Sequence, residues 1–429
     1  MSSQNLSVFS SSLGKENFSV TFFFPIGFRA LVQKNVLSVK VAGVAVAVAA
    51  VVVAAVAVVA HQHGPSACGH VFGVSGTGYD ILKIAIFHMP FAATLVQHAF
   101  GRTLFDVAPG DISLGVGAPD ATLLAAARDV YLESVAEALQ QPLSHDLLQY
   151  GPTRGDGGFL TELAEFLSRQ YNDVVQREQL VVTSGASFGL MVLCQLFARP
   201  GQALFTADPC YFISRDIFRD AGLRIVSVDS DEDGMDMAAL ERALQDHAGQ
   251  TSTLPFNALI YLVPTHCNPT STTLPLERRR QLIRLAYKYQ CLVVCDDVYD
   301  MLTFPGSGPT PPRIVALDTP EEGPGCVISN GTFSKIFGPG VRLGWMEGRE
   351  SLLSVVANSG VYYSGGSPNH LTSGIFRVAM QTQRIDRLLV TLRNTYSERA
   401  AAFCAVLREA NLRFKQPLGG FFVWVSAFK

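Results

Sequence analysis

The sequence is short of charge. Charged residues make up 16% of its 429 residues, and the formal net charge is only −3. A charge this small creates no strong field of either sign, so it does not favour binding to nucleic acid. The mean hydropathy of +0.25 is high for a soluble enzyme. The length leaves room for two or three domains with substantial buried cores.

Paired cysteines are also lacking. The eight cysteines have neither the spacing of a disulfide framework nor that of a metal site. Cys291 and Cys295 flank an apolar Leu-Val-Val segment, which favours a buried strand in which they act as small hydrophobic residues. We therefore expect no metal site. This cysteine usage fits a reducing compartment, either the cytoplasm or the mitochondrion.

Acidic residues are almost absent from the first hundred positions, where only two occur. Val41 to Ala60 is an uncharged run of valine and alanine with one glycine, and its length matches the ~20 residues that cross a bilayer. Two lysines before it would place the N-terminus in the cytoplasm. We interpret residues 1–105 as an atypical N-terminal extension with a possible transmembrane helix at 41–60. A targeting segment and a low-complexity extension without a membrane role remain alternatives.

From residue 112 onward the pattern is that of an α/β protein. Short apolar runs predict strands at 112–116, 180–183, 203–205, 223–228, 258–263, 292–295 and 327–328. Apolar residues at helical spacing predict helices at 121–139, 160–171, 188–197 and 276–289. This alternation predicts a doubly wound, mostly parallel sheet with helices on both faces. The continuous apolar strands agree with burial on both sides.

Polar residues follow five of these strands. In doubly wound sheets, ligands bind beyond the carboxyl ends of the strands. The five ends carry the segments Ser184–Ser187, Asp208–Tyr211, Asn268–Thr270, Asp296–Tyr299 and Ser329–Trp345. Their coincidence predicts one binding site at this edge of the sheet.

The last of these segments contains a single lysine, Lys335, among hydroxyl residues. Such an amine can form a Schiff base with a carbonyl compound and then act as general base and acid. The helix that begins near Ala186 and Ser187 offers free N–H groups and a dipole to a phosphate. Arg342 can add a two-pronged contact to the same anion.

A carboxylate is also available. If the bound ligand contains a ring with a nitrogen atom, Asp296 beside that nitrogen would keep it protonated. Tyr299 and Asn268 could hydrogen-bond an oxygen on the same ring. Each residue has a simpler reading when taken alone. Lys335 could be a solvated loop lysine, Asp296 a helix cap, Asn268 part of a turn, and Tyr211 a core residue.

These motifs resemble those of the class I/II aminotransferases, fold-type I enzymes that use pyridoxal 5′-phosphate (PLP). The resemblance covers residues 112–428 and is nearest to the kynurenine and 2-aminoadipate aminotransferase branch. It rests on T-F-S-K-I-F-G-P-G-V-R-L-G-W, L-Q-Y-G-P-T-R-G, T-S-G-A-S, N-P-T and D-D-V-Y. It implies a transaminase that moves an amino group from an amino acid to a 2-oxo acid through a Schiff base at Lys335. The alternatives are a PLP-dependent lyase or decarboxylase of the same fold, and a PLP-binding but inactive, membrane-tethered protein.

The resemblance also assigns roles to residues. Lys335, Asp296 and Tyr299 would be catalytic, and Gly117 and Asn268 would contact the substrate. PLP would be bound by Tyr150, Ala186, Ser187, Tyr211, Asn268, Asp296, Tyr299, Ser334, Lys335 and Arg342. Tyr150 would reach the cofactor of a neighbouring subunit, which implies a homodimer. Ser271 stands where the family usually has glycine.

The same resemblance divides the chain into domains. It places part of a small domain at 106–145, a large PLP-binding domain at 146–348 and a C-terminal small domain at 349–429. We expect this small α+β domain to be incomplete, because the family continues for several dozen residues beyond the Gly-Gly-Phe-Phe motif at 419–422. That continuation includes an arginine that binds the substrate carboxylate.

Overall fold

The fold is taken from a computed structural model, which describes residues 82–83, 117–247 and 255–427. The chain forms two compact units. One contains residues 104–398 and 417–423, and the other contains 1–103, 399–416 and 424–429. The predicted membrane segment at 41–60 and the predicted strand at 112–116 lie outside the described residues. No helix in the described part is long and apolar enough to cross a membrane.

The larger unit is built on an eight-stranded sheet. In spatial order its strands are β2 (Leu180–Thr183), β9 (Gly344–Gly348), β8 (Val327–Thr332), β7 (Cys291–Asp296), β6 (Ala258–Leu262), β3 (Ala203–Asp208), β4 (Arg224–Asp231) and β5 (Gly234–Met235). Strands β8, β7, β6, β3 and β4 pair in parallel, whereas β9 and β5 pair antiparallel to their neighbours. The predicted doubly wound, mostly parallel sheet is confirmed.

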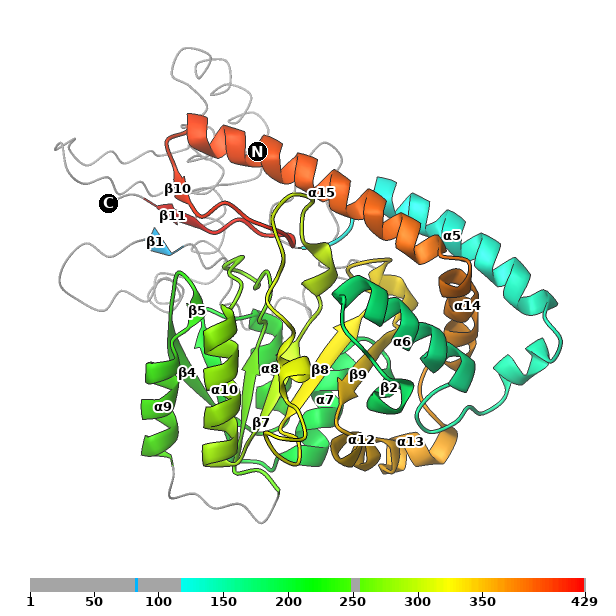
Figure 1. The fold of residues 1–429 in the computed structure, drawn as a ribbon, viewed down its shortest axis with the longest axis horizontal. Coiled ribbons are helices and arrows are strands. Elements are labelled where there is room, and N and C mark those ends of the chain that lie inside the picture. The colour runs from blue at the N-terminus through cyan, green and yellow to red at the C-terminus, as the bar shows by residue number, and fades with distance from the viewer. Residues whose placement is uncertain (1–81, 84–116, 248–254, 428–429) are drawn as a thin grey trace, which may run out of the picture. The chain divides into compact units, whose positions relative to one another are not determined.

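Helices cover both faces of this sheet (Figure 1). α7 (Ala186–Phe197) packs on β2, β8 and β9, and it contacts α8 (Phe212–Asp220). A second group of helices also packs on the sheet. In it, α9 (Met237–Asp246) contacts β4, α10 (Leu276–Tyr289) contacts β7 and α11 (Ile314–Leu317) contacts β8. Every residue of β2, β6, β7, β8 and β9 is buried, as expected for strands covered on both sides.

Three further helices pack together beside the sheet, namely α5 (Ala121–Gln140), α6 (Gly157–Tyr171) and α14 (His370–Gln381). The Asp120 and Asp156 carboxylates accept backbone N–H groups at the starts of α5 and α6, which fixes where these helices begin. The remaining helices are α12 (Glu350–Ala357), α13 (Gly360–Gly365) and α15 (Arg384–Glu409). The four predicted helices are confirmed, each within a few residues of its expected ends.

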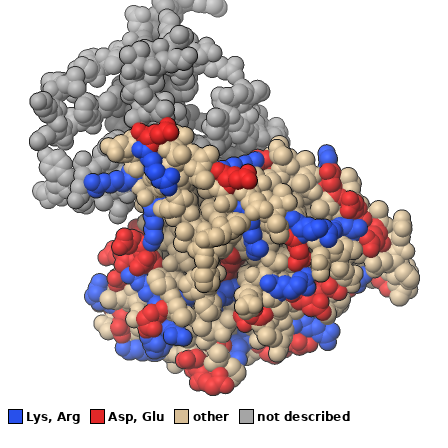
Figure 2. Space-filling view, turned by 45° about the horizontal axis from the view of Figure 1, so that its top comes forward, with Lys and Arg blue, Asp and Glu red and all other residues tan. Residues whose placement is uncertain are grey.

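The smaller unit contains a three-stranded antiparallel sheet. Its order is β1 (Leu82–Lys83), β11 (Val425–Ala427) and β10 (Arg413–Phe414). The domain boundaries expected at 106–145, 146–348 and 349–429 stay predictions. On the face shown in Figure 2, basic and acidic side chains are interspersed over the described residues.

Candidate active site

The carboxyl ends of β2, β3, β6, β7 and β8 lie along one edge of the sheet, because β2 and β8 both run antiparallel to β9. Lys335 lies in the turn after β8. Its Nζ donates a hydrogen bond of 2.8 Å to the Gly117 carbonyl and lies 5.9 Å and 5.7 Å from the ring centroids of Tyr299 and Phe421. Burial among these groups lowers the pKa of Lys335 to about 8, and the charge of Asp296 opposes this shift. The amine therefore holds a substantial neutral, nucleophilic fraction near neutral pH.

Asp296 ends β7 and is 3% exposed. Its Oδ2 accepts a hydrogen bond of 2.8 Å from the Tyr261 hydroxyl, and its Oδ1 accepts one of 3.2 Å from Asn330 Nδ2. Burial raises the pKa of Asp296 to about 6, whereas the two hydrogen bonds and the Lys335 charge act in the opposite direction. A buried carboxylate of this kind is stabilised by a cationic partner.

Tyr299, Asn268 and Tyr211 are brought to the same place. Tyr299 is 3% exposed. Burial raises its pKa well above the ordinary value, the charges of Tyr211 and Asp296 add to this rise, and a hydrogen bond with Asn268 opposes it. The pKa of Tyr211 is also raised by burial and by Asp296, and is lowered by Arg342. Tyr299 is thus within electrostatic or hydrogen-bond range of Tyr211, Asp296 and Asn268, and Tyr211 is within electrostatic range of Asp296 and Arg342.

The start of α7 has the features of an anion site. Its N-cap is Gly185, so no side chain caps the first N–H groups, which belong to Ala186, Ser187 and the residues after them. A Cβ added to Gly185 would lie 2.9 Å from the Arg342 guanidinium. Arg342 is held there by bonds of 3.2 Å to the Ser184 carbonyl and 3.1 Å to the Pro339 carbonyl. A helix N-terminus beside a guanidinium suits a phosphate group.

Ser334 precedes Lys335 and is held close to the end of β8. Its backbone N–H donates to Thr332 Oγ1 at 3.1 Å, and the two hydroxyls hydrogen-bond at 2.9 Å. Tyr150 differs from the other predicted residues because it is 81% exposed. Its ring lies 3.6 Å from the position of a Cβ on Gly365.

One of the simpler interpretations can now be excluded. Asp296 does not cap a helix, since Tyr299 is the residue before the short 3₁₀ helix Asp300–Leu302 and it makes no side-chain cap. Ser271 has a φ of 58°. This left-handed conformation favours glycine, which gives a physical reason for the residue usual in the family. In the described part of the chain, no cluster of three or more His, Cys, Asp or Glu residues could hold a metal ion.

Four residues of the site were not singled out from the sequence. Tyr261 carries a polar hydroxyl inside the otherwise apolar strand β6, and that contrast was an available signal, whereas Asn330 has the polar neighbours Ser329 and Thr332 in β8. Phe421 and Phe422 follow the Gly-Gly pair near the C-terminus, and both rings pack against Tyr299 at 5.7 Å and 5.8 Å between centroids. A Cβ on Gly117 would lie 2.6 Å from the Phe422 ring, so this close approach requires glycine.

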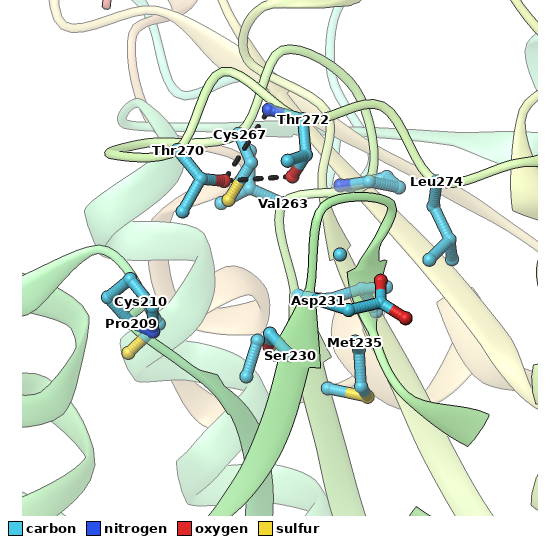
Figure 3. Close-up of a pocket in the computed structure, with 14 residues that line it drawn as sticks. Pro209, Cys210, Ser230, Asp231, Met235, Val263, Cys267, Thr270, Thr272 and Leu274 are labelled. Atoms are coloured by element: carbon cyan, nitrogen blue, oxygen red, sulfur yellow. Dashed lines mark hydrogen bonds between the residues drawn. The ribbon is translucent and has the colours of Figure 1, made fainter. Parts of the chain in front are cut away.

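Figure 3 shows a small cavity in the larger unit. It measures about 30 Å³ and is lined by Cys210 and Cys267, which adjoin Tyr211 and Asn268 in the chain. A cavity of this size holds about one water molecule. It is too small for a cofactor or a substrate, so we do not assign the binding site to it.

Comparisons with known proteins identify the family. The family described as aminotransferase class I and II matches residues 110–427. The 2-aminoadipate transaminase of Thermus thermophilus is 28% identical over 74% of this chain and 75% of that protein. The aromatic-amino-acid aminotransferase 1 of Thermococcus litoralis is 28% identical over 65% of both. The crystal structure of Pyrococcus horikoshii kynurenine aminotransferase has a TM-score of 0.64 at 26% identity and covers 73% of this chain and 74% of that one. The chain belongs to the class I and II aminotransferases.

Its cofactor is PLP, and its function is that of a transaminase. The described residues fit this cofactor in three respects. The uncapped start of α7 with Arg342 offers donors to a phosphate, Asp296 offers a buried carboxylate, and Lys335 offers an amine with a lowered pKa.

Proposed function

We propose that this site transfers an amino group from an amino acid to a 2-oxo acid, with Lys335 holding the cofactor and moving the proton. Bound PLP supplies an aldehyde for the amine and a ring that accepts electrons from the substrate. The observation that carries the proposal is the environment of Lys335 Nζ, which lies 5.9 Å and 5.7 Å from the ring centroids of Tyr299 and Phe421, donates a hydrogen bond to the Gly117 carbonyl and has a pKa of about 8.

In this proposal the residues at the strand ends each hold one part of the cofactor. The first turn of α7, Ser334 and Arg342 bind the phosphate. This assignment is supported by the free N–H groups of Ala186 and Ser187 and by the guanidinium beside Gly185. These contacts anchor the end of the cofactor that does not react.

The ring is held by a second set of residues. Asp296 would pair with the ring nitrogen, Asn268 and Tyr299 would hydrogen-bond the ring oxygen, and Tyr211 would pack against the ring. The support is that the charge of Asp296 raises the pKa of both Tyr211 and Tyr299, and that Tyr211 also raises the pKa of Tyr299, which places these side chains within electrostatic range. An ionised Asp296 keeps the ring nitrogen protonated and favours electron withdrawal from the substrate.

Lys335 then acts as base and acid. With its Nζ free, Lys335 would take the proton from the α-carbon of the amino acid and deliver it to the cofactor carbon that carries the amino group. General acid–base catalysis is most efficient when the pKa lies near the working pH. A pKa of about 8 meets this condition far better than the ordinary 10.5.

We further propose that the substrates include amino acids with apolar or aromatic side chains. The rings of Phe421 and Tyr299 contact each other, with their centroids 5.7 Å and 5.9 Å from Lys335 Nζ, and the Phe422 ring packs against Gly117. Gly117 and Asn268 would contact the substrate, and the aromatic rings would exclude water from the reacting atoms. The relatives named for aromatic amino acids and for kynurenine support this substrate class.

The exposed apolar residues near Tyr150 favour a homodimer. Leu148, Tyr150 and Tyr363 are 76%, 81% and 78% exposed. Large exposed apolar side chains of this kind are typical of an interface. In the proposed dimer, Tyr150 reaches the phosphate bound by the partner subunit, and analytical ultracentrifugation would test it by the mass of the particle.

The proposed function is tested by product analysis. The purified protein is given PLP, one amino acid of a panel and 2-oxoglutarate, and the 2-oxo acid made from each donor is measured. We expect a free 2-oxo acid with the wild type and with Lys288→Ala, whose side chain pairs with Glu241. We expect at least a thousandfold less with Lys335→Ala, because both the nucleophile and the general base are lost.

Other outcomes would overturn the proposal. Loss of carbon dioxide or of the substrate side chain without a 2-oxo acid would identify a lyase or decarboxylase. PLP binding without turnover of any donor would identify an inactive binding protein. Unchanged activity in Lys335→Ala would remove Lys335 from the mechanism.

A further inference from the structure

Tyr261 and Asn330 make the two side-chain hydrogen bonds to Asp296. We propose that they are positioning residues that orient the Asp296 carboxylate and keep it available to the cofactor's ring nitrogen. The inference rests on the proposed role of Asp296. It assigns a function to two residues whose own side chains have no place in the mechanism above.

The sheet register brings the three side chains together. Asp296 of β7 is paired with Asn330 of β8, and Tyr261 of β6 is paired with Val294, two residues before Asp296. Side chains two residues apart on a strand point to the same face. The three polar groups therefore lie side by side on the face that α7 covers. Tyr261 and Asn330 are both 0% exposed, so water does not compete for these bonds.

The number of hydrogen bonds suits the proposed role. Each carboxylate oxygen of Asp296 accepts one bond, at 2.8 Å from Tyr261 and at 3.2 Å from Asn330. A carboxylate has about four lone-pair positions, so both oxygens keep one for a further donor. Two fixed donors also remove the freedom of the carboxylate to rotate. Its remaining lone pairs then point in defined directions.

The hydrogen bonds from Tyr261 and Asn330 also favour the ionised form of Asp296. A buried carboxyl group without hydrogen bonds becomes neutral, and a neutral acid cannot balance a positive ring nitrogen. Burial raises the pKa of Asp296, and the bonds from Tyr261 and Asn330 counter this effect. Without them, Asp296 would be protonated over a wider pH range.

Asn330 has a second contact that links the carboxylate to the phosphate site. Its Nδ2 also donates at 3.0 Å to the carbonyl of Ala186, the first residue of α7. A Cβ on Gly189 would lie 2.2 Å from Asn330 Oδ1, so α7 can approach β8 this closely only with glycine at that position. Asn330 thus sets the position of the N-terminus of α7 relative to Asp296. These are the two groups proposed to bind opposite ends of the cofactor.

Tyr261 is held from the other side. Its ring packs edge-on against Phe218 of α8, with 5.0 Å between centroids. A tyrosine with a packed ring delivers its hydroxyl to one place at little entropic cost, because only two side-chain torsions must be fixed. The same burial would also suit a purely structural role, so the test must separate the two.

The test compares two ligands that differ only at the ring nitrogen. Dissociation constants of the apoprotein are measured for PLP and for its 1-deaza analogue, in which CH replaces that nitrogen. The variants are Tyr261→Phe, Asn330→Leu and Asp296→Asn. Tyr287→Phe is the matched control, because the Tyr287 hydroxyl donates to the Asp318 carboxylate at the opposite ends of the strands. Circular dichroism and melting temperature show which variants fold.

The wild type and Tyr287→Phe should prefer PLP to the deaza analogue by the same factor. Asp296→Asn should lose this preference. Tyr261→Phe and Asn330→Leu should each reduce it about tenfold, the size of one hydrogen bond to a charged group. If either variant fails to fold, the other decides the question.

The results distinguish the proposed role of Asp296 from the proposed role of Tyr261 and Asn330. If Asp296→Asn keeps the wild-type preference, the proposed role of Asp296 is wrong. If Asp296→Asn loses the preference while the folded Tyr261 and Asn330 variants weaken both ligands equally, those residues only support packing. The positioning inference alone would then be rejected.

Discussion

The carboxylates of the consecutive residues Asp296 and Asp297 lie on opposite faces of the sheet. Asp296 accepts from Asn330, whereas Asp297 accepts from the hydroxyl of Ser329, the residue before it on β8. Successive residues of a strand point to opposite faces, so the first carboxylate faces α7 and the cofactor site. Burial and the neighbouring charge of Asp300 raise the pKa of Asp297 well above its ordinary value, and the charges of Arg313 and Arg279 act in the opposite direction. Asp296 is therefore on the side of the proposed site, whereas Asp297 belongs to the core on the other face.

Asp296 should destabilise the apoprotein at neutral pH. Its pKa is raised from 3.8 to about 6, so the folded state binds the proton more tightly than the unfolded state does. Stability from this group is therefore present below about pH 4 and is lost as the pH rises through 6. The loss corresponds to roughly 3 kcal/mol at 1.36 kcal/mol per pKa unit. Apo Asp296→Asn should be more stable than the wild type by up to this amount at pH 7.5, as measured by urea unfolding.

The difference should shrink as the pH is lowered towards 4, where the wild-type carboxyl is protonated. Saturating PLP should stabilise the wild type more than the variant, because the wild type binds it more tightly. Equal stability of the two apoproteins at pH 7.5 would show that burial does not penalise the Asp296 charge.

A buried ion pair that has no part in the proposed mechanism stabilises the fold. Arg313 and Glu347 are 5% and 6% exposed in their side chains and form a two-pronged ion pair, with one of its bonds at 3.0 Å. Arg313 also stacks on the Tyr171 ring at 3.9 Å. Glu347→Gln removes the two-pronged partner of a buried guanidinium and leaves it only the longer contact of 3.5 Å to Asp173, so it should cost about 3–5 kcal/mol of unfolding free energy. Urea unfolding at pH 7 measures this loss.

The control for this variant is Glu277→Gln. Glu277 pairs with Arg284 on the surface, where both side chains are more than half exposed. Such pairs contribute up to about 0.5 kcal/mol. Replacing both buried partners by Met and Leu should cost less than Glu347→Gln alone, since no uncompensated charge remains. A loss below about 1 kcal/mol for Glu347→Gln would mean that water reaches the buried pair.

Lys335 should react as a nucleophile at unusually low pH. Burial lowers its pKa from 10.5 to about 8, and only the neutral amine attacks an electrophile. Its acetylation rate in the apoprotein, followed by peptide mass spectrometry, should rise with pH and reach half its maximum near pH 8. Lys288 is the internal control, because its pairing with Glu241 raises its pKa above 10.5. A midpoint for Lys335 near 10.5 would contradict the buried environment described above.

Gly185 should be required for phosphate binding. Its φ is 78°, and a Cβ there would lie 2.9 Å from Arg342. Gly185→Ala should weaken binding of PLP about tenfold relative to pyridoxal, which lacks the phosphate, because the guanidinium is displaced. Gly201→Ala is the matched control, with a φ of 85° and open space around its Cβ. If both variants changed the ratio of affinities equally, backbone strain rather than Arg342 would be the cause.

Much of this arrangement could be predicted from the sequence. The helix at 276–289 has the predicted bounds, because amphipathic spacing and a preceding proline define it locally. The grouping of Tyr211, Asn268, Asp296 and Lys335 was predictable because a parallel sheet brings the carboxyl ends of its strands to one edge. These predictions require only that the strands are parallel, and do not require their exact register.

Other parts depend on register and could not be predicted. The contact of Tyr261 and Asn330 with Asp296 requires the exact pairing of β6, β7 and β8, and a shift of one residue would turn each side chain to the other face. The approach of Phe421 to Lys335 joins segments more than 80 residues apart. No local pattern specifies such a contact.

The central claim is that Lys335 carries the cofactor, and covalent mapping tests it most directly. The protein is incubated with PLP, treated with sodium borohydride to fix the cofactor to its amine, digested and analysed by mass spectrometry. We predict one stoichiometric phosphopyridoxyl group, located on Lys335, and none at Lys288. A stoichiometric label on another lysine, or no label on Lys335, would contradict the account.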